Sequence, residues 1–449
     1  MRKIPLALLA LAVVLGVAVI YAAAQSRVPA LPSLAVVPAS PVPATVIGAT
    51  PTRAPVHNPF VEDPSFVPLT GTRAYSGEVA GAGYRIEVPQ KWNGDLVLYA
   101  HGWHGGSQLT VDDLPIRTLA VQQGFAWAAS SFSAGGYIPE DGVQDTLALR
   151  DFFSQTVGAP KRTYIYGTSM GGHIVVASLE QYPAIYAGGL SECGVVSGVG
   201  GWDYFAGYTL LGAYFGGVDL TAPDNHIPFV AGSLLANKIY PALGLSAGTL
   251  TDKGRQFRSG VINLSGGHRP FAAEGFATYY QTTFEAGISV VVDSSFKGKA
   301  INTTELKYHL DAGLGIDDTT LNAGVKRLSA DPSARNFEKH YEFSGFKGTL
   351  KTPLLTIHDT GDMFAPIGLE QQYRATVEAA GAGSMLVQRA IRRIEHCDFS
   401  PAERGRAWTD LVAWVTSGTR PQGDDLSGSL LDVGRQWTSP LRPDDPGHP

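Results

Sequence analysis

The chain has 449 residues, of which 44% are hydrophobic and 16% charged, so it is long enough for one large core with a sizeable insertion or for two modest domains. Its formal net charge of −6 excludes the basic excess that nucleic-acid binding requires, and no nucleic-acid partner is expected. The 53 glycines and 29 prolines favour a fold rich in turns over a helical bundle.

The N-terminus has the pattern of a secretory signal peptide. Arg2 and Lys3 precede an apolar run over residues 4–24, which closes with the small residues Ala22, Ala23 and Ala24. The run is also long enough to span a bilayer, so residues 1–24 are interpreted as a signal peptide or, alternatively, as an uncleaved membrane anchor. In either case we expect a secreted or extracytoplasmic protein, and a membrane is a partner only if the segment is uncleaved.

Two segments lack the periodicity of regular structure. Residues 25–63 are rich in Pro and Ala and are expected to form an extended linker. Residues 418–449 are expected to form a loosely ordered C-terminal tail, in which Leu430, Leu431 and Trp437 are the side chains suited to docking.

Short apolar strands alternate with helical patterns through the rest of the chain. Strands are predicted at 84–88, 96–100, 125–129, 163–166, 187–191, 353–357 and 385–390. Helices are predicted at 143–153, 173–181, 369–380 and 402–415. The alternation predicts an α/β fold in which residues 64–193 and 349–417 form a mostly parallel central sheet flanked by helices.

The candidate nucleophile lies in the sequence Gly-Thr-Ser-Met-Gly at 167–171. A G-x-S-x-G pattern is weak evidence by itself in a chain this rich in glycine. Here an apolar strand runs into the pattern and an apolar-faced helix leaves it, which is the setting that a nucleophilic serine on a strained turn requires. Ser169 is therefore the predicted nucleophile, and the N–H of Met170 at the helix N-terminus is a predicted oxyanion donor.

A second oxyanion donor is predicted after the strand 96–100, where the chain reads His-Gly-Trp-His-Gly-Gly. The glycines allow close backbone approach, and the N–H of Trp103 is the preferred donor. His101 and His104 are spaced as a metal pair could be, but no third ligand is near them in the sequence. We therefore interpret His101 as packing the turn, and no metal is expected.

Residues 194–348 interrupt the strand and helix rhythm. This segment is too long for a loop and is rich in Gly and aromatic residues. It begins directly after the strand that follows the candidate nucleophile, where an insertion would cover the site. We expect a large, mainly helical cap.

The acid and the base are predicted near the C-terminus. Asp359 and Asp362 both follow the strand 353–357; Asp362 lies in the turn before Ala365 and Pro366, whereas Asp359 is nearer the strand and could brace the turn instead. Asp362 is preferred as the acid. His396 is the only histidine between this acid and the last helix, so it is the predicted general base.

The chain has two cysteines, Cys193 and Cys397, and both fall in loops at the predicted active-site edge of the sheet. A disulfide is predicted because the chain is expected to be exported, and it would tie the His396 loop to the sheet. The alternative is two reduced, buried thiols.

Four segments resemble motifs of the α/β-hydrolase superfamily: HGWHGG at 101–106, GTSMGG at 167–172, HDTGD at 358–362 and HC at 396–397. The resemblance implies an α/β-hydrolase fold and a Ser-Asp-His mechanism. The run YRIEVPQKWNGDLVLYAHGW resembles secreted bacterial members of unassigned specificity. The His-Cys pair is similar to that of tannases and feruloyl esterases, which place the partner Cys directly before the nucleophile, where this chain has Thr168.

The hypothesis is a secreted serine hydrolase that cleaves a small-molecule carboxylic ester through an acyl-enzyme. A serine peptidase or aminopeptidase of the same fold is one alternative, because the same triad cleaves amides. A non-catalytic binding protein that retains the fold is another. No dinucleotide fingerprint follows any predicted strand, and no cofactor is expected.

Overall fold

The computed structural model describes residues 66–105, 109–336 and 345–441. The predicted signal peptide and linker at 1–63 lie outside these residues, as does Gly106 of the first motif. By its contacts the chain divides into residues 1–48 and 49–449, and all described residues belong to the second unit. No helix in the described ranges combines the length and the apolar character needed to cross a membrane.

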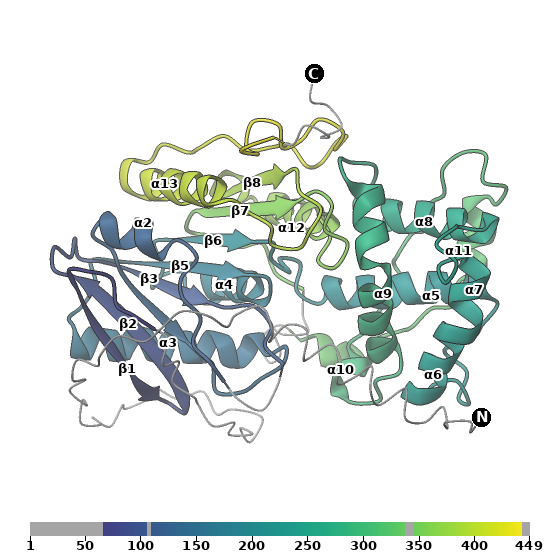
Figure 1. Ribbon diagram of the computed structural model, residues 1–449, viewed down its shortest axis with the longest axis horizontal. Helices are drawn as coiled ribbons and strands as arrows, with labels where there is room; N and C mark the ends of the chain where they lie inside the picture. The colour runs from purple at the N-terminus through teal and green to yellow at the C-terminus, as the bar shows by residue number, and fades with distance from the viewer. Residues whose placement is uncertain (1–65, 106–108, 337–344, 442–449) are drawn as a thin grey trace, which may run out of the picture. The chain divides into compact units, whose positions relative to one another are not determined.

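The core is an eight-stranded sheet with the order β1-β2-β4-β3-β5-β6-β7-β8 (Figure 1). The strands are β1 (Thr72–Val79), β2 (Ala82–Pro89), β3 (Asp95–Ala100), β4 (Ala126–Ser130), β5 (Arg162–Thr168), β6 (Gly188–Glu192), β7 (Leu354–Asp359) and β8 (Leu386–Ile391). Strand β2 pairs antiparallel with β1 and with β4, and every other pairing is parallel. The predicted, mostly parallel sheet is confirmed.

Strand β1 was not predicted from the sequence. It is the edge strand, and none of its residues is fully buried, so its side chains carry no apolar alternation. Backbone pairing with β2 along its whole length forms the strand instead. Helix α2 (Arg117–Gln122) was also missed, because it has six residues and one buried side chain, Ala120.

Helices cover both faces of the sheet. Leu96 and Leu98 of β3 belong to one hydrophobic cluster with residues of α3 (Pro139–Thr156), α4 (Met170–Gln181) and α12 (Gly368–Ala379). Val97 and Tyr99 point to the other face and belong to a second cluster, with residues of α2 and α13 (Pro401–Ser417). Because both faces are buried, β3 has a continuous apolar sequence, as parallel strands in such sheets do.

Seven α-helices lie between β6 and β7 in the described chain. They are α5 (Gly200–Gly216), α6 (Pro228–Leu234), α7 (Tyr240–Leu243), α8 (Asp252–Leu264), α9 (Ala272–Val291), α10 (Phe296–Lys299) and α11 (Asp318–Gly324). They share a hydrophobic cluster of their own, in which the rings of Tyr208, Phe257 and Phe284 contact one another. Much of the aromatic content of this segment therefore forms its own core.

Residues 418–441 carry the three side chains that the sequence analysis singles out as suited to docking. Leu430 and Trp437 are buried, whereas Leu431 is exposed. The reason is the guanidinium of Arg392 just after β8, which is fully buried and donates to the backbone carbonyl of Val433 at 2.9 Å. A buried cation requires such acceptors, and the tail supplies them.

Candidate active site

Ser169 lies on a strained turn between β5 and α4. Its backbone has φ +57° and ψ −115°, a conformation that residues other than glycine rarely adopt. A Cβ added at Gly171 would collide with the carbonyl of Ala100 at the end of β3, and one at Gly167 would collide with the carbonyl of Gly171. Both glycines are thus required by contacts, and the serine is held at the carboxyl edge of the sheet.

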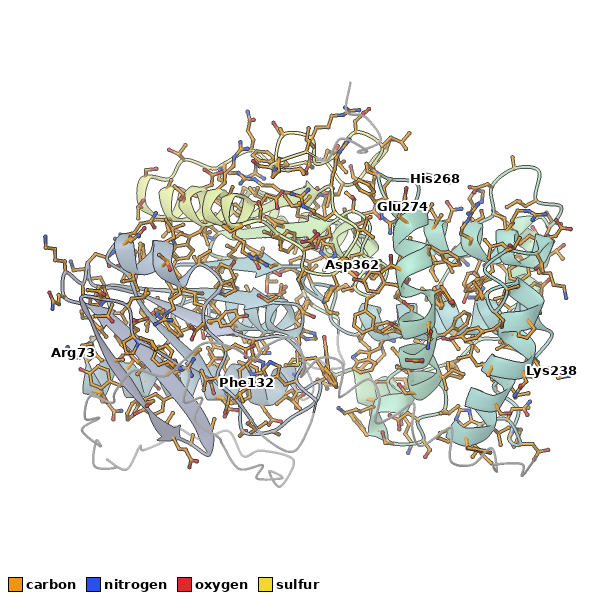
Figure 2. The ribbon with its side chains drawn as sticks, viewed as in Figure 1. Arg73, Phe132, Lys238, His268, Glu274 and Asp362 are labelled. Atoms are coloured by element: carbon orange, nitrogen blue, oxygen red, sulfur yellow. A yellow bond between two sulfur atoms is a disulfide. The ribbon has the colours of Figure 1, made fainter. Side chains whose placement is uncertain are left out.

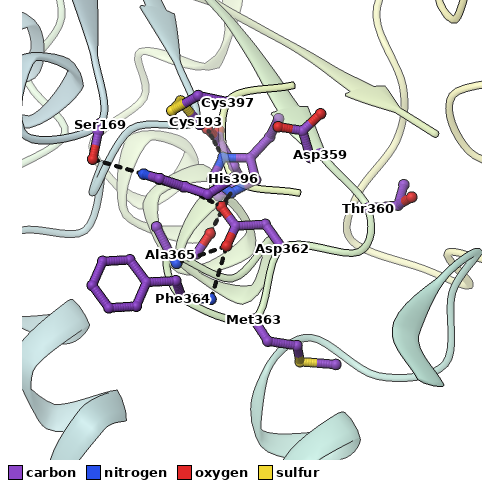
Figure 3. A network of polar contacts seen from close by, with 12 residues as sticks. Ser169, Cys193, Asp359, Thr360, Asp362, Met363, Phe364, Ala365, His396 and Cys397 are labelled. Carbon is purple, nitrogen blue, oxygen red and sulfur yellow. Dashed lines mark hydrogen bonds and ion pairs between the residues drawn. A yellow bond between two sulfur atoms is a disulfide. The ribbon is translucent and has the colours of Figure 1, made fainter. Parts of the chain in front are cut away.

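The structure brings the three predicted triad residues together (Figure 3). His396 Nε2 lies 2.8 Å from Ser169 Oγ, and His396 Nδ1 lies 2.6 Å from Asp362 Oδ2. Ser169 and His396 are 227 positions apart in the sequence. Ser169 is partly exposed, and 19% of the His396 side chain is exposed, whereas Asp362 is fully buried. A ligand can thus reach the hydroxyl while the carboxylate stays away from water.

The acid turn holds Asp362 as a carboxylate. Its Oδ1 accepts hydrogen bonds from the backbone N–H groups of Phe364 at 2.8 Å and Ala365 at 3.0 Å. Burial acts to raise the pKa of Asp362, but the charge and hydrogen bond of His396, then His358 and the Phe364 N–H, hold that pKa below its usual value. The carboxylate is therefore the form that faces the imidazole.

Asp359, the competing aspartate, has a different position. Its Oδ2 accepts from the backbone N–H of Asp398 at 3.2 Å, so it braces the loop that follows His396. Burial, together with the neighbouring carboxylates of Asp362 and Asp398, raises the pKa of Asp359 well above its usual value. Of the two aspartates, only Asp362 lies against the imidazole.

The two predicted oxyanion donors lie on backbone beside Ser169. Met170 begins helix α4, where an N–H has no carbonyl one turn earlier to bond. A Cβ added at Gly102 would lie 3.5 Å from the Cβ of Ser169, so the peptide that carries the Trp103 N–H passes next to the serine. The indole of Trp103 is 60% exposed.

His101 and His104 have a third neighbour that the sequence analysis missed. Asp112 Oδ2 lies 3.0 Å from His104 Nε2, so the statement that no third ligand is near was wrong. However, the two imidazole rings are stacked, 4.1 Å apart and 18° from parallel, and His101 also stacks on Phe132. Stacked rings do not aim their nitrogens at one point, as ligands of a tetrahedral metal must. The arrangement fits the packing role predicted for His101.

The predicted disulfide is confirmed. It joins Cys193, which follows β6, to Cys397, which follows His396, with a Cα–Cα distance of 5.3 Å (Figure 3). Ser169, Cys193 and Cys397 all have positive φ, so the strained backbone positions gather around the site. A disulfide fits an extracytoplasmic location.

Helix α9 and its neighbours hold the loops that carry Asp362 and His396. The hydroxyl of Tyr279 accepts from the backbone N–H of His396 at 2.6 Å. Tyr204 donates its hydroxyl to the carbonyl of Met363 at 2.8 Å, and Arg269 Nε donates to the carbonyl of Thr360 at 2.6 Å. Figure 2 shows Asp362 where the edge of the sheet meets α9.

Nothing in the sequence marks these three supporting residues. Tyr204, Arg269 and Tyr279 lie from 91 to 159 positions before their partners. Each is also an ordinary residue for a helical segment, and only its partner gives it a role. Sequence periodicity predicts which face of a helix is buried, but not which loop packs there.

Comparisons with known proteins give distant likenesses. No protein-family model matches the chain. The chain is 26% identical to o-phthalyl amidase of Xanthobacter agilis over 409 residues. The match covers 77% of this chain and 88% of that protein.

Two solved structures illustrate the structural likeness. Feruloyl esterase B from Aspergillus oryzae is 16% identical and covers 78% of this chain and 80% of its own, with a TM-score of 0.48. A hormone-sensitive lipase from a metagenome library is 13% identical and covers 79% of this chain and 86% of its own, with a TM-score of 0.39.

The architecture defines the fold class. A mostly parallel eight-stranded sheet has helices on both faces, and a strained strand-to-helix turn presents Ser169 at its edge. Asp362 and His396 follow later strands, in the chain order Ser, Asp, His. The chain has the α/β-hydrolase fold, and the resemblance seen in the sequence is confirmed at the level of the fold.

Proposed function

We propose that the protein is a serine hydrolase that cleaves carboxylic esters, with Ser169 as nucleophile, His396 as general base and Asp362 as the acid that orients it. The observation that carries the proposal is the line of two hydrogen bonds, 2.8 Å from Ser169 Oγ to His396 Nε2 and 2.6 Å from His396 Nδ1 to Asp362. These are the distances that proton transfer requires.

In the proposed mechanism, His396 Nε2 removes the Ser169 proton as Oγ attacks the ester carbonyl. The N–H groups of Trp103 and Met170 bind the oxyanion of the tetrahedral intermediate. His396 then gives the proton to the leaving alcohol, and an acyl-enzyme remains. Water, deprotonated by His396, attacks the acyl group, and the acid is released as Ser169 regains its proton.

Aromatic side chains near Ser169 favour an apolar or aromatic acyl or alcohol group. The ring of Phe364 lies 5.8 Å from the imidazole of His396 and 5.1 Å from the ring of Phe205. Trp103, whose backbone lies beside Ser169, is 60% exposed. Flat apolar surfaces of this kind bind aromatic rings by offset or edge contacts. The proposed partner is therefore a small ester.

Amide hydrolysis is the second candidate. The specific observation is the likeness to the protein named o-phthalyl amidase, which is 26% identical and is matched over 88% of its length. The same triad can cleave an amide when the imidazolium protonates the leaving amine.

We further propose an extracytoplasmic location and a cap formed by residues 194–348. The disulfide between Cys193 and Cys397 supports the location, together with the signal-like pattern at residues 1–24. The contacts of Arg269 and Tyr279 with the triad loops support the cap.

The experiment is labelling by a fluorophosphonate, followed by kinetics on matched substrates. Wild type and Ser154→Ala, which removes a hydroxyl bonded within helix α3, are expected to be labelled, and Ser169→Ala is not. A p-nitrophenyl ester and a p-nitroanilide of the same aromatic acid then compare the two candidates. Faster anilide cleavage would favour the amide candidate. A folded wild type that is not labelled would instead favour a binding protein.

A further inference from the structure

Two more ionisable side chains lie directly behind the triad. His358 is on β7 and Glu370 is in the first turn of α12, and both are fully buried. His358 Nε2 lies 2.5 Å from the carbonyl oxygen of Ala365 and 3.9 Å from Asp362 Oδ2. His358 Nδ1 lies 3.3 Å from Glu370 Oε1. The proposed function assigns neither residue a role.

The partners of His358 determine where its protons lie. The carbonyl of Ala365 can only accept, so His358 Nε2 must carry a hydrogen and donate it. His358 Nδ1 faces the carboxyl group of Glu370, and one further proton can lie between them.

The other oxygen of Glu370 is already occupied by donors. Its Oε2 accepts from the hydroxyl of Thr356 at 2.8 Å and from the amide nitrogen of Gln388 at 2.5 Å. The amide orientation of Gln388 follows from Arg374, whose Nε donates to the Gln388 oxygen at 2.8 Å. Because both donors point at Oε2, a proton shared by the two groups can lie only on the line from Glu370 Oε1 to His358 Nδ1.

The surrounding charges favour an imidazolium at His358. Burial acts to lower the pKa of His358, but the hydrogen bond and charge of Glu370, and then the charge of Asp362, outweigh it and hold that pKa above its usual value. Asp359 is also buried nearby, but its raised pKa favours the neutral form. The buried guanidinium of Arg269 acts electrostatically on Asp362 from the helical segment.

We propose that His358 is a positioning residue, a buried imidazolium that is held by Glu370 and that fixes the ionised carboxylate of Asp362. Charges of alternating sign then run from Glu370 through His358 to Asp362. His358 and Asp362 are also connected through hydrogen bonds to the backbone of Ala365. His358 Nε2 donates to the Ala365 carbonyl, and the Ala365 N–H donates to Asp362 Oδ1. Loss of His358 would release both the charge and the turn.

The first test is the protonation state, which is independent of catalysis. Protein labelled with ¹⁵N-histidine is observed by NMR at pH 7.5, about one unit above the ordinary imidazole pKa of about 6.5, where such a ring is mostly neutral. One ring with both nitrogens protonated is expected. It should disappear in His358→Gln and persist in His268→Gln, which removes an exposed histidine (Figure 2).

A wild-type spectrum at pH 7.5 without a doubly protonated ring would overturn the proposal. This measurement uses the wild-type protein alone, so it does not depend on whether a variant folds. Loss of the signal in His268→Gln, with its retention in His358→Gln, would also overturn it.

The second test is kinetic and rests on the proposed function. In His358→Gln and Glu370→Gln, kcat per labelled Ser169 is expected to fall about 10- to 100-fold with KM little changed, since a misplaced catalytic group costs rate rather than binding. The double variant should be no worse than the poorer single one, because the pair acts as a unit. Glu378→Gln, at the exposed end of α12, is the matched control.

The kinetic result can fail separately from the proposed function. If wild type is labelled but all variants keep kcat within about 2-fold, the positioning role is wrong while the serine mechanism stands. If wild type is not labelled, the proposed function fails, and the NMR result still decides the charge of His358.

Discussion

Replacing Asp362 with asparagine tests the triad assignment, and the structure dictates how the new side chain must sit. Oδ1 accepts from two backbone N–H groups, those of Phe364 and Ala365. The asparagine oxygen must keep that position, which turns its NH₂ toward His396 Nδ1. An NH₂ group only donates, so Nδ1 becomes an acceptor and the ring hydrogen moves to Nε2, which faces Ser169. The imidazole can then no longer take the serine proton.

The size of the effect follows from the alternatives open to the side chain. Turning the asparagine the other way would leave two buried N–H groups without acceptors, at a cost of about 1–3 kcal/mol each. The wrong tautomer therefore dominates. Such a change lowers kcat about 10⁴-fold in a serine triad. At 1.36 kcal/mol per tenfold, this is about 5 kcal/mol of transition-state stabilisation.

The assay is kcat on a p-nitrophenyl ester for wild type, Asp362→Asn and Asp359→Asn. Asp359 is the matched control: its raised pKa favours the neutral acid, and an asparagine oxygen can still accept from the Asp398 N–H. Asp359→Asn is expected to keep kcat within about 5-fold, as its side chain does not touch the imidazole. Equal losses in both variants, or activity of Asp362→Asn within tenfold of wild type, would refute the assignment.

Three further predictions concern support, pH and the disulfide. Tyr279→Phe removes the acceptor of the His396 N–H and should lower kcat about 10-fold or more in a steady-state assay. Tyr280→Phe on the same helix should leave kcat unchanged, and equal effects of the two variants would contradict the supporting role of Tyr279. Burial raises the pKa of Asp145 to about 7, above its unfolded value, so its proton is bound more tightly in the folded state. As the pH rises from about 4 to 7, the contribution of Asp145 to the free energy of unfolding should therefore fall by on the order of 4 kcal/mol. Urea titrations should show that Asp145→Asn removes this fall, and an unchanged pH dependence in the variant would contradict the assignment to Asp145. The double variant of Cys193 and Cys397 to serine should lose about 2–5 kcal/mol of unfolding free energy in the same titration, and no loss would show that the bridge does not stabilise the fold.

Sequence patterns alone predicted the strands that carry the site. The apolar run of β3 and the strand-to-helix turn at Ser169 each leave a pattern within a short stretch of sequence, so both could be predicted without knowing the tertiary contacts. The preference for Asp362 over Asp359 followed from its position in the turn together with the family resemblance. The disulfide prediction followed from the expected export of the chain and from the place of both cysteines in loops after predicted strands. Edge strand β1 was missed because backbone pairing, rather than side-chain pattern, creates it.

Only the tertiary structure revealed the residues around the triad. Tyr279 acquires its role because α9 packs on a loop 117 positions later in the chain. Asp112 approaches His104, and His358 lies between Glu370 and Asp362, because strands and turns meet at one edge of the sheet. A sequence shows which side chains are buried, but hydrogen-bond partners and charges depend on distances between atoms that only packing brings together.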